Sequence, residues 1–317
     1  MGESISKIAA LPHAAVAADT LSVVTWNVWF DSLERERRIR HILCTMQSMQ
    51  PDVACFQEVT AHFIAVLRHN SALNAEYDVF EDVSPAFGVS AKSYGALIMC
   101  KKTYAATFSR HNLTSLMERD LLVAELQLGK GQRACVATVH LESMDSHNVR
   151  VQQMKEIKDV FSSKSSALLA QSPSTVCSAC DPVVFCGDFN FCSDSNWGVP
   201  PSEASPLYNN DLSAIFPDFV DVWPQLHATD GLKGYTWDCC SNLMLKDKGN
   251  KDPLCRLDRV LMRSDGRWRA SSVDMLGTSS IHTLQLPGDA GSAGASVSVF
   301  PSDHFGLHAV FKLDGRC

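Results

Sequence analysis

The chain has 317 residues, of which 45% are hydrophobic and 20% are charged, so a sizeable core can form and wholesale disorder is excluded. Its 35 acidic and 28 basic residues give a net charge of −7, which argues against a protein that coats nucleic acid non-specifically but allows an enzyme with a local basic groove. No apolar run approaches the ~20 residues of a membrane span, so we expect a soluble protein without membrane contact.

Residues 1–20 are expected to form a flexible N-terminal tail. Their apolar stretch Ile8–Ala18 is interrupted by Pro12 and His13 and does not resemble a secretory signal. The start formally fits the myristoylation pattern, but no basic cluster follows that would strengthen such an anchor. Scattered cysteines in apolar runs are typical of an intracellular protein with reduced thiols.

Strands and helices alternate after this tail. Leu21–Phe30, rich in β-branched and aromatic residues, predicts a strand. Glu34–Met49 has apolar residues at helical spacing and stops before Pro51. Val53–Val59 then predicts a strand, and Ala61–Leu73 predicts a helix.

Hairpins enter the pattern in the middle of the chain. The expected strands Leu121–Leu128 and Cys135–Leu141 are joined by a Gly-rich turn. A loop is expected over Pro287–Ser298. Because helices alternate with strands but hairpins also occur, we expect mixed sheets in a single α/β domain. The other expected elements are a helix at Asn148–Leu169 and strands at Tyr94–Lys101, Val183–Cys186, Arg256–Met262 and Gly306–Lys312.

Five polar clusters each stand at the end of a strand-like apolar run. Polar groups that converge from distant strand ends form active sites. Singly each is weak evidence, since a lone histidine is more often a structural core residue and Asp-x-Asn after glycine is as often a turn. The clusters are Trp26–Asn27, Gln57–Glu58, His140–Ser143, Gly187–Asn190 and Ser302–His304.

Together, and in this order, the clusters resemble the motifs of the endonuclease/exonuclease/phosphatase family, which run WN, QE, H, GDxN and SDH. The resemblance covers about residues 21–317 and implies one catalytic domain over that range. The fold it implies is a four-layer α/β sandwich, with two mixed, mostly antiparallel β-sheets flanked by helices. The chain departs from the pattern at Phe189, where relatives often have Thr or Met, and in the long loop before Pro301.

Further segments resemble the tyrosyl-DNA phosphodiesterase branch of this family. Asn27–Phe30 and Val273–Thr278 look most like its plant-type or protist-type members. We expect no ubiquitin-binding domain before residue 21. The other segments are Glu118–Val123, His140–Ser143, Tyr235–Asp238, Ser241–Leu243, Arg256–Arg259 and Pro301–Leu307.

Phosphodiester hydrolysis needs a nucleophile at phosphorus and groups that stabilise the added negative charge. Glu58 is expected to bind Mg²⁺, for which Mn²⁺ would substitute, and Asn27 to steer a water or a phosphate oxygen. Asp188 is the expected base for the attacking water, and Asn190 is expected to hold water or phosphate.

Two histidines complete the expected catalytic group. A protonated His304 would stabilise the transition-state oxyanion, and His140 is a second donor to the phosphate. Ser143 could add another hydrogen bond. Asp303 either orients His304 or coordinates the metal, and the sequence leaves both roles open.

Substrate contacts are implied by the resemblance. Trp237, Leu243 and Leu245 match the family's apolar wall beside the 5′ nucleotide, with ordinary core packing as the alternative, and Tyr94 matches a position near the substrate. Arg256 is expected to contact DNA.

Together with this chemistry, the resemblance implies a Mg²⁺-dependent phosphodiesterase that hydrolyses the 5′-phosphotyrosyl bond between DNA and a trapped topoisomerase tyrosine, leaving a 5′-phosphate, in DNA repair. A phenol pKa near 10 suits a site without an identifiable general acid. The alternatives are an abasic-site endonuclease, a deadenylase, or an inositol or sphingomyelin phosphodiesterase. A non-catalytic scaffold is disfavoured by the intact motifs. The expected partner is a DNA 5′ end carrying a tyrosyl or peptide adduct. We expect the protein to be a monomer that is located in the nucleus and also in the cytoplasm.

Overall fold

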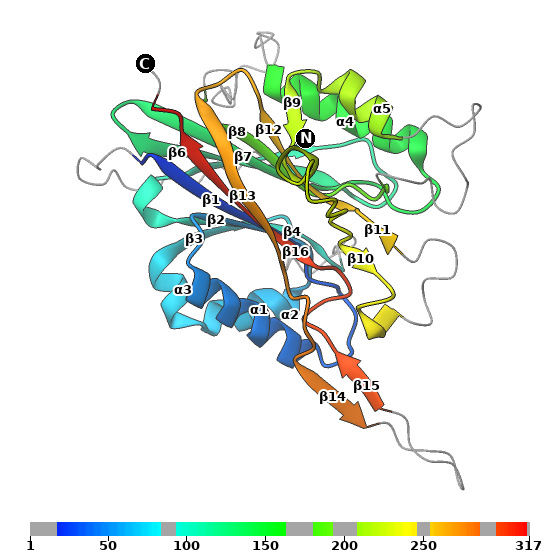
Figure 1. The fold of residues 1–317 in the computed structure, drawn as a ribbon. Helices are drawn as coiled ribbons and strands as arrows, with labels where there is room; N and C mark the ends of the chain where they lie inside the picture. The colour runs from blue at the N-terminus through cyan, green and yellow to red at the C-terminus, as the bar shows by residue number, and fades with distance from the viewer. Residues whose placement is uncertain are drawn as a thin grey trace, which may run out of the picture.

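The computed structural model describes residues 18–83, 93–162, 180–192, 208–245, 254–285 and 296–315. Within these ranges two six-stranded sheets lie face to face (Figure 1). The first sheet has the order β13 (Trp268–Leu276), β16 (Gly306–Leu313), β1 (Thr20–Asn27), β2 (Val53–Val59), β4 (Gly95–Lys101) and β3 (Tyr77–Glu81). The second has the order β5 (Thr107–Asn112), β6 (Asp120–Gly129), β7 (Gln132–His140), β8 (Val183–Asp188), β12 (Asp258–Arg263) and β9 (Phe219–Asp221).

Both sheets are mixed and mostly antiparallel. The neighbours β1 and β2 run parallel, as do β7 and β8. All other neighbours within the two sheets are antiparallel. Each parallel pair is linked through a helix, as parallel neighbours require.

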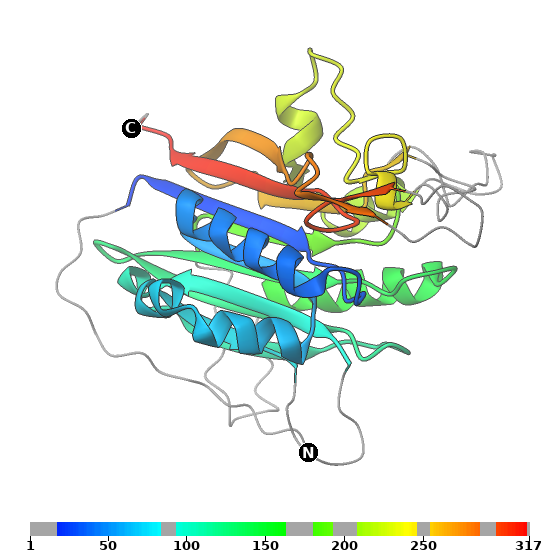
Figure 2. The ribbon, with the colours of Figure 1, turned by 90° about the horizontal axis from the view of Figure 1, so that it is seen from below.

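Helices cover the outer face of each sheet. The helices α1 (Arg35–Met49), α2 (Ala61–His69) and α3 (Ser71–Glu76) pack on the first sheet, and Figure 2 views the molecule from their side. On the second sheet lie α4 (His147–Ser162) and α5 (Tyr208–Ile215) (Figure 1). A third core lies between the two sheets. The protein is therefore a four-layer α/β sandwich, as the motif resemblance implies.

Smaller elements join the layers. The short helix α6 (Val222–Leu226) contacts both β12 and β13, which belong to different sheets. A hairpin of β14 (His282–Gln285) and β15 (Ser296–Val299) projects from the body (Figure 1). The remaining elements are β10 (Trp237–Asp238), β11 (Leu254–Cys255) and the 3-10 helices η1 (Lys102–Tyr104) and η3 (Leu243–Leu245). No described helix combines the length and apolarity needed to cross a membrane.

Two local expectations are corrected. The segment Ala61–Leu73 is two helices rather than one, because the Asn70 side chain accepts a hydrogen bond from the Leu73 amide and starts α3 where α2 ends. The expected loop at Pro287–Ser298 ends in strand β15, while residues 287–295 lie outside the described residues. Residues 1–17 of the expected tail also lie outside them.

Candidate active site

Strand register brings the polar clusters to one end of the two facing sheets. Asn27, the last residue of β1, stands opposite Gln57 of β2. In the other sheet His140 ends β7 opposite Asp188, which ends β8. Asp258, the first residue of β12, is the other neighbour of Asp188. Residues from distant parts of the chain therefore meet because their strands end together.

A bulge in β2 separates the directions of two consecutive side chains. The pairing of β2 with β4 shifts register between Phe56 and Val59, and Glu58 adopts the left-handed φ of 58°. Gln57 consequently points between the sheets and donates to Thr138 Oγ1 at 2.9 Å. A left-handed backbone costs free energy at a residue other than glycine, and such strain is common where a side chain must be aimed at a site.

Glu58 faces a second carboxylate. It accepts hydrogen bonds from Asn27 Nδ2 at 3.2 Å and from the Phe30 amide at 3.1 Å. Burial and then the negative charge of Asp303 raise the pKa of Glu58 to about 7. Two carboxylates that oppose each other's ionisation suit a hard divalent cation between them, so Glu58 and Asp303 fit the expected metal site.

Asp188 lies at the centre of the group and is 1% exposed. Its Oδ2 accepts from Asn27 Nδ2 at 3.0 Å and lies 3.5 Å from His140 Nε2 and 3.9 Å from His304 Nε2. Its Oδ1 accepts from the Asn190 amide at 2.9 Å. Burial alone would raise the pKa of Asp188, but the two histidines and these hydrogen bonds outweigh burial and lower it. Asp188 is thus a carboxylate at neutral pH.

His304 is held as a cation by an acidic partner that sequence reasoning did not assign. Its Nδ1 lies 2.7 Å from Asp258 Oδ2 in a fully buried pair. Burial opposes the charge on His304, but the carboxylates of Asp258, Asp188 and Asp303 outweigh burial and hold its pKa well above the usual value. The signal for Asp258 was present in the segment Arg256–Arg259, where an acid stands at the start of a strand.

His140 is held in the opposite protonation state. Its Nδ1 lies 3.1 Å from Arg119 Nη1. Because a guanidinium only donates, Nδ1 must accept, and the ring proton lies on Nε2, which faces Asp188. Burial and then the charge of Arg119 lower the pKa of His140 to about 3. His140 is therefore a neutral hydrogen-bond donor.

The loop before β16 is anchored to the site from several directions. Trp26 Nε1 donates to the His304 carbonyl at 3.0 Å, and Ser302 Oγ donates to the Asn27 carbonyl at 2.6 Å. Asn242 Nδ2 donates to the Ser302 carbonyl at 2.8 Å. Asn242, which lies in the segment Ser241–Leu243 that resembles the family, thus positions the loop that carries His304.

Thr236 performs a similar role at the start of β12. Its Oγ1 accepts from the amides of Leu257 at 3.2 Å and Asp258 at 3.0 Å. Its carbonyl accepts from the Phe305 amide at 2.7 Å. Thr236 therefore fixes both members of the Asp258–His304 pair through the backbone.

Aromatic and apolar side chains line the approach to this group. Tyr94 stacks on Phe30 with ring centroids 4.6 Å apart, and its ring centroid lies 6.3 Å from that of His140. On the other side, Trp237 presents an edge to His304 at 5.2 Å. Tyr94 and Trp237 therefore lie beside the two histidines, and substrate contact by them stays a prediction.

The remaining expected contacts differ in what they can offer. Leu243 is 47% exposed, whereas Leu245 is fully buried and has no surface for a ligand. Ser143 Oγ donates to the Met117 sulfur at 3.0 Å. Arg256 is not brought to the catalytic group, since it pairs with Asp221 at 2.7 Å and lines a separate cavity.

A second set of potential metal ligands exists. Asp188, Asp258 and His304 each offer a ligand atom within 4.8 Å of the others, and all three are buried. The Nδ1 atom of His304 is already engaged by Asp258, so this set is better described as a hydrogen-bonded proton-holding group. Glu58 and Asp303, whose like charges raise the pKa of Glu58, remain the better fit to a divalent ion.

Solved structures share the fold of this chain. The structure of D. rerio TDP2 complexed with single strand DNA product has a TM-score of 0.66 and 21% identity, covering 93% of this chain and 100% of that chain. Truncated Caenorhabditis elegans TDP2 has a TM-score of 0.65 and 21% identity, with 92% and 98% covered. The human Nocturnin catalytic domain with bound sulfate anion has a TM-score of 0.60 and 17% identity, with 98% and 97% covered.

No curated protein sequence matches the chain. The model of the Endonuclease/Exonuclease/phosphatase family matches residues 24–304, which span the first and the last of the polar clusters. The chain belongs to the endonuclease/exonuclease/phosphatase family.

Proposed function

We propose that this protein is a divalent-metal-dependent phosphodiesterase that hydrolyses the 5′-phosphotyrosyl bond of DNA and leaves a 5′-phosphate. The observation that carries the proposal is the placing of one ionised carboxylate, Asp188, between a cationic His304 and a neutral His140. The pair of Glu58 and Asp303 would hold Mg²⁺ or Mn²⁺, which when bound supplies positive charge to the phosphoryl oxygens.

The reaction follows from these protonation states. Asp188 accepts a proton from the attacking water as the new bond to phosphorus forms. His304 stabilises the added negative charge, and His140 donates a hydrogen bond to the same phosphate from Nε2. Asn27 donates hydrogen bonds to both Glu58 and Asp188 and so fixes the positions of these carboxylates relative to each other. The backbone amide of Asn190 also holds Asp188 in place.

The leaving group follows from the same states. Neutral His140 is too weak an acid to release its Nε2 proton, and the carboxylates around His304 hold the pKa of His304 well above its usual value, so that its imidazolium is a weak acid as well. The bond from phosphorus to the leaving oxygen therefore breaks with the electron pair on that oxygen. A tyrosine phenolate, with a pKa near 10, tolerates this charge far better than a sugar alkoxide.

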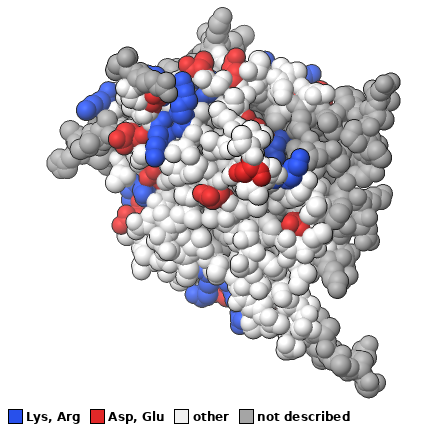
Figure 3. All heavy atoms as spheres, viewed as in Figure 1, with Lys and Arg blue, Asp and Glu red and all other residues white. Residues whose placement is uncertain are grey.

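Two observations support DNA as the carrier of the adduct. The similar D. rerio protein was solved with a single strand DNA product. Trp237 and Leu243 offer apolar surface on the His304 side for a terminal base. On the face drawn in Figure 3, Lys and Arg form small groups interspersed with Asp and Glu.

The biological setting is part of the proposal. Removal of a topoisomerase tyrosine from a DNA 5′ end is a repair reaction, for which a nuclear monomer is expected. A tagged protein that is excluded from the nucleus would contradict this setting without affecting the chemistry.

Polarity and metal dependence test the proposal. Matched oligonucleotides carrying a 5′-phosphotyrosyl or a 3′-phosphotyrosyl end are incubated with the protein, with Mg²⁺ and with excess EDTA. We expect the 5′ substrate to be cleaved at least ~10²-fold faster, and only with metal. A 3′ preference, or undiminished hydrolysis in EDTA, would overturn the proposal.

A further inference from the structure

A cavity of about 440 Å³ lies on the opposite side of β12 from the catalytic group. Side chains alternate between the two faces of a strand, so Asp258 points to His304 while its neighbour Arg259 points away. The cavity is walled by α5, by α6 and by residues 227–233, with Arg256 and Arg259 on the third side. Its volume is in the range of small-molecule sites.

Two arginines at this cavity share one carboxylate oxygen. Asp221 Oδ2 lies 2.7 Å from Arg256 Nη1 and 3.0 Å from Arg259 Nη1. Arg256 is 5% exposed and Arg259 is 1% exposed. One negative charge therefore faces two buried positive charges, and the imbalance is costly without a further anion.

The two arginines differ in what remains free. Arg259 also donates to the Phe191 carbonyl at 3.3 Å and lies over the Phe191 ring at 4.5 Å, so it acts as a brace. Arg256 uses only Nη1, and among the described residues its Nε and Nη2 have no hydrogen-bond partner. The exposed Lys233 adds a third cation to the lining, against the single carboxylate of Asp221.

The wall of the cavity is built in advance. Trp223 Nε1 donates to the Leu232 carbonyl at 2.9 Å. Gly234 packs so closely on the Trp223 ring that a Cβ there would clash with it. His227 is held by Asp230 at 2.7 Å and by the Val273 carbonyl at 3.2 Å. These contacts fix the segment over the cavity, which reduces the ordering cost of binding.

We propose that this cavity binds a phosphate dianion, either free or carried on a small organic group such as a nucleoside. Free guanidinium donors match the oxygens of phosphate, and Lys233 supplies further charge. Trp223, Pro224 and Leu212 form an apolar wall on which an organic group would pack. The proposal is independent of the proposed hydrolysis, because none of these residues belongs to the catalytic group.

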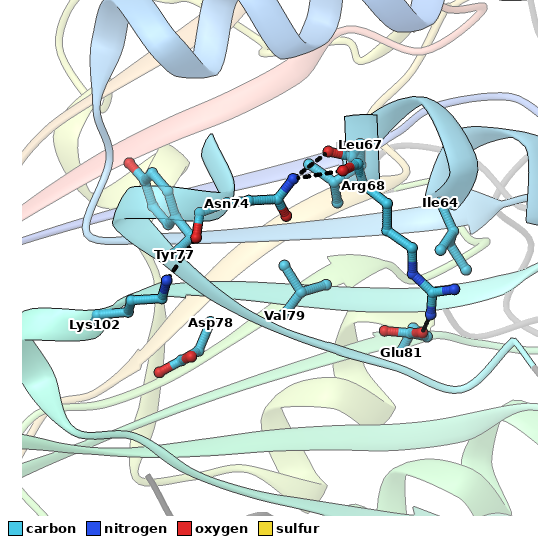
Figure 4. A pocket seen from close by; sticks show the side chains of 9 residues that line it. All are labelled: Ile64, Leu67, Arg68, Asn74, Tyr77, Asp78, Val79, Glu81 and Lys102. Atoms are coloured by element: carbon cyan, nitrogen blue, oxygen red, sulfur yellow. Dashed lines mark hydrogen bonds and ion pairs between the residues drawn. The ribbon is translucent and has the colours of Figure 1, made fainter. Parts of the chain in front are cut away.

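A second cavity serves for comparison, because its lining has no excess of unpaired positive charge. It holds about 270 Å³ between α2, α3 and β3 (Figure 4). Arg68 pairs with Glu81 at 2.8 Å, and Lys102 donates to the carbonyls of Asn74 and Ala75. Its cations are thus engaged by the protein itself, and it carries no comparable requirement for an anion.

Binding is tested on the purified full chain by calorimetry and thermal unfolding, in EDTA. The probes are inorganic phosphate, adenosine 5′-monophosphate and adenosine. We expect phosphate and the nucleotide to raise the Tm by about 3 °C or more at saturation, and adenosine to have no effect. If the nucleotide binds more tightly than inorganic phosphate, the apolar wall contacts the nucleoside group. If the two bind equally, the site recognises free phosphate.

Variants place the binding in this cavity. Arg256→Gln keeps a donor toward Asp221 but removes the charge, and we expect Kd to rise at least about tenfold. Lys233→Gln, at an exposed position, should weaken binding severalfold and remains informative if Arg256→Gln does not fold. The control Arg267→Gln alters a distant exposed arginine, 63% exposed at its side chain, and should bind normally.

His304→Gln separates this cavity from the catalytic group, and it should retain the phosphate response. The proposal is overturned by an absent response in the unaltered protein, by binding of adenosine alone, or by a response lost in His304→Gln but kept in Arg256→Gln.

Discussion

Asp188 concentrates more of the proposed chemistry than any other residue. Replacing it with Asn keeps the size of the side chain and removes the proton acceptor. We expect Asp188→Asn to lower kcat at least ~10²-fold, with a folded protein by circular dichroism. The partly exposed Asp211, replaced in the same way, is the matched control and should leave kcat unchanged. Near-normal turnover by Asp188→Asn would exclude this residue as the base.

The lowered pKa of His140 leads to a prediction about stability rather than rate. Its pKa in the folded protein is about 3, whereas an unfolded histidine titrates near 6.5. Between these values the unfolded chain binds one more proton, so the contribution of His140 to stability falls as pH drops below about 6.5.

We therefore expect His140→Gln to flatten the fall in the free energy of unfolding between pH 7 and pH 5, by up to about 1.4 kcal/mol per pH unit. Urea unfolding at several pH values measures this slope. The exposed His62→Gln serves as the control. Parallel curves for His140→Gln and the unaltered protein would contradict the buried neutral state.

Single residues also show how far the sequence could predict the site. Glu58, Asp188 and His304 could be predicted because each follows a strand-like run and matches a family motif. Asp258 was not assigned, because its partner His304 lies 46 residues away and only the packing of the loop before β16 on the start of β12 brings the two together. Arg119 likewise acquires its role only through contact with His140.

At the scale of elements, the close approach of β7 and β8 depends on Gly187. Its φ is +138°, and a Cβ there would clash with the Val139 carbonyl. We expect Gly187→Ala to reduce the free energy of unfolding by at least about 3 kcal/mol, since backbone must move.

Gly131 in the β6–β7 turn is the matched control for Gly187. It has a φ of +74° with open space around it, so Gly131→Ala should cost only about 1 kcal/mol. Equal costs for the two alanine variants, measured by denaturant unfolding, would remove the steric explanation.

Thr236 links two elements and should affect both stability and rate. Thr236→Val leaves the buried amides of Leu257 and Asp258 without their acceptor, which costs about 1–3 kcal/mol. We also expect kcat to fall, because the Asp258–His304 pair loses its backbone support. Thr236→Ser retains the hydroxyl and should restore most of both. Failure of Ser to restore either quantity would argue for packing rather than hydrogen bonding.

The accuracy of the element predictions has physical causes. The strand Val53–Val59 was predicted with its observed bounds because it is short and apolar and ends at polar residues. The strand β13 was not predicted, because its exposed positions carry polar residues such as Ser271 and Asp274 and only its pairing with β16 fixes it. The break at Asn70 depends on a side-chain cap that periodicity does not reveal.

For the whole molecule, the four-layer arrangement brings the ends of strands from both sheets together, so that each sheet supplies only part of the catalytic group. Asn27, Glu58 and the loop with His304 come from the first sheet, while His140, Asp188 and Asp258 come from the second. The resemblance of motifs predicted this architecture, whereas the order of predicted helices, strands and hairpins alone indicated only mixed α/β sheets. The choice of substrate within the family rests on protonation states that depend on both sheets being in place.

Hydrolysis of three matched oligonucleotides in Mg²⁺ tests that choice most directly. One carries a 5′-phosphotyrosyl end, one the same end linked through an alkyl alcohol, and one an internal abasic site. Because neither histidine supplies a proton to the leaving oxygen, we predict cleavage of the phosphotyrosyl end at least ~10²-fold faster than of the other two. Comparable rates on the alkyl-linked end or the abasic site would contradict the account.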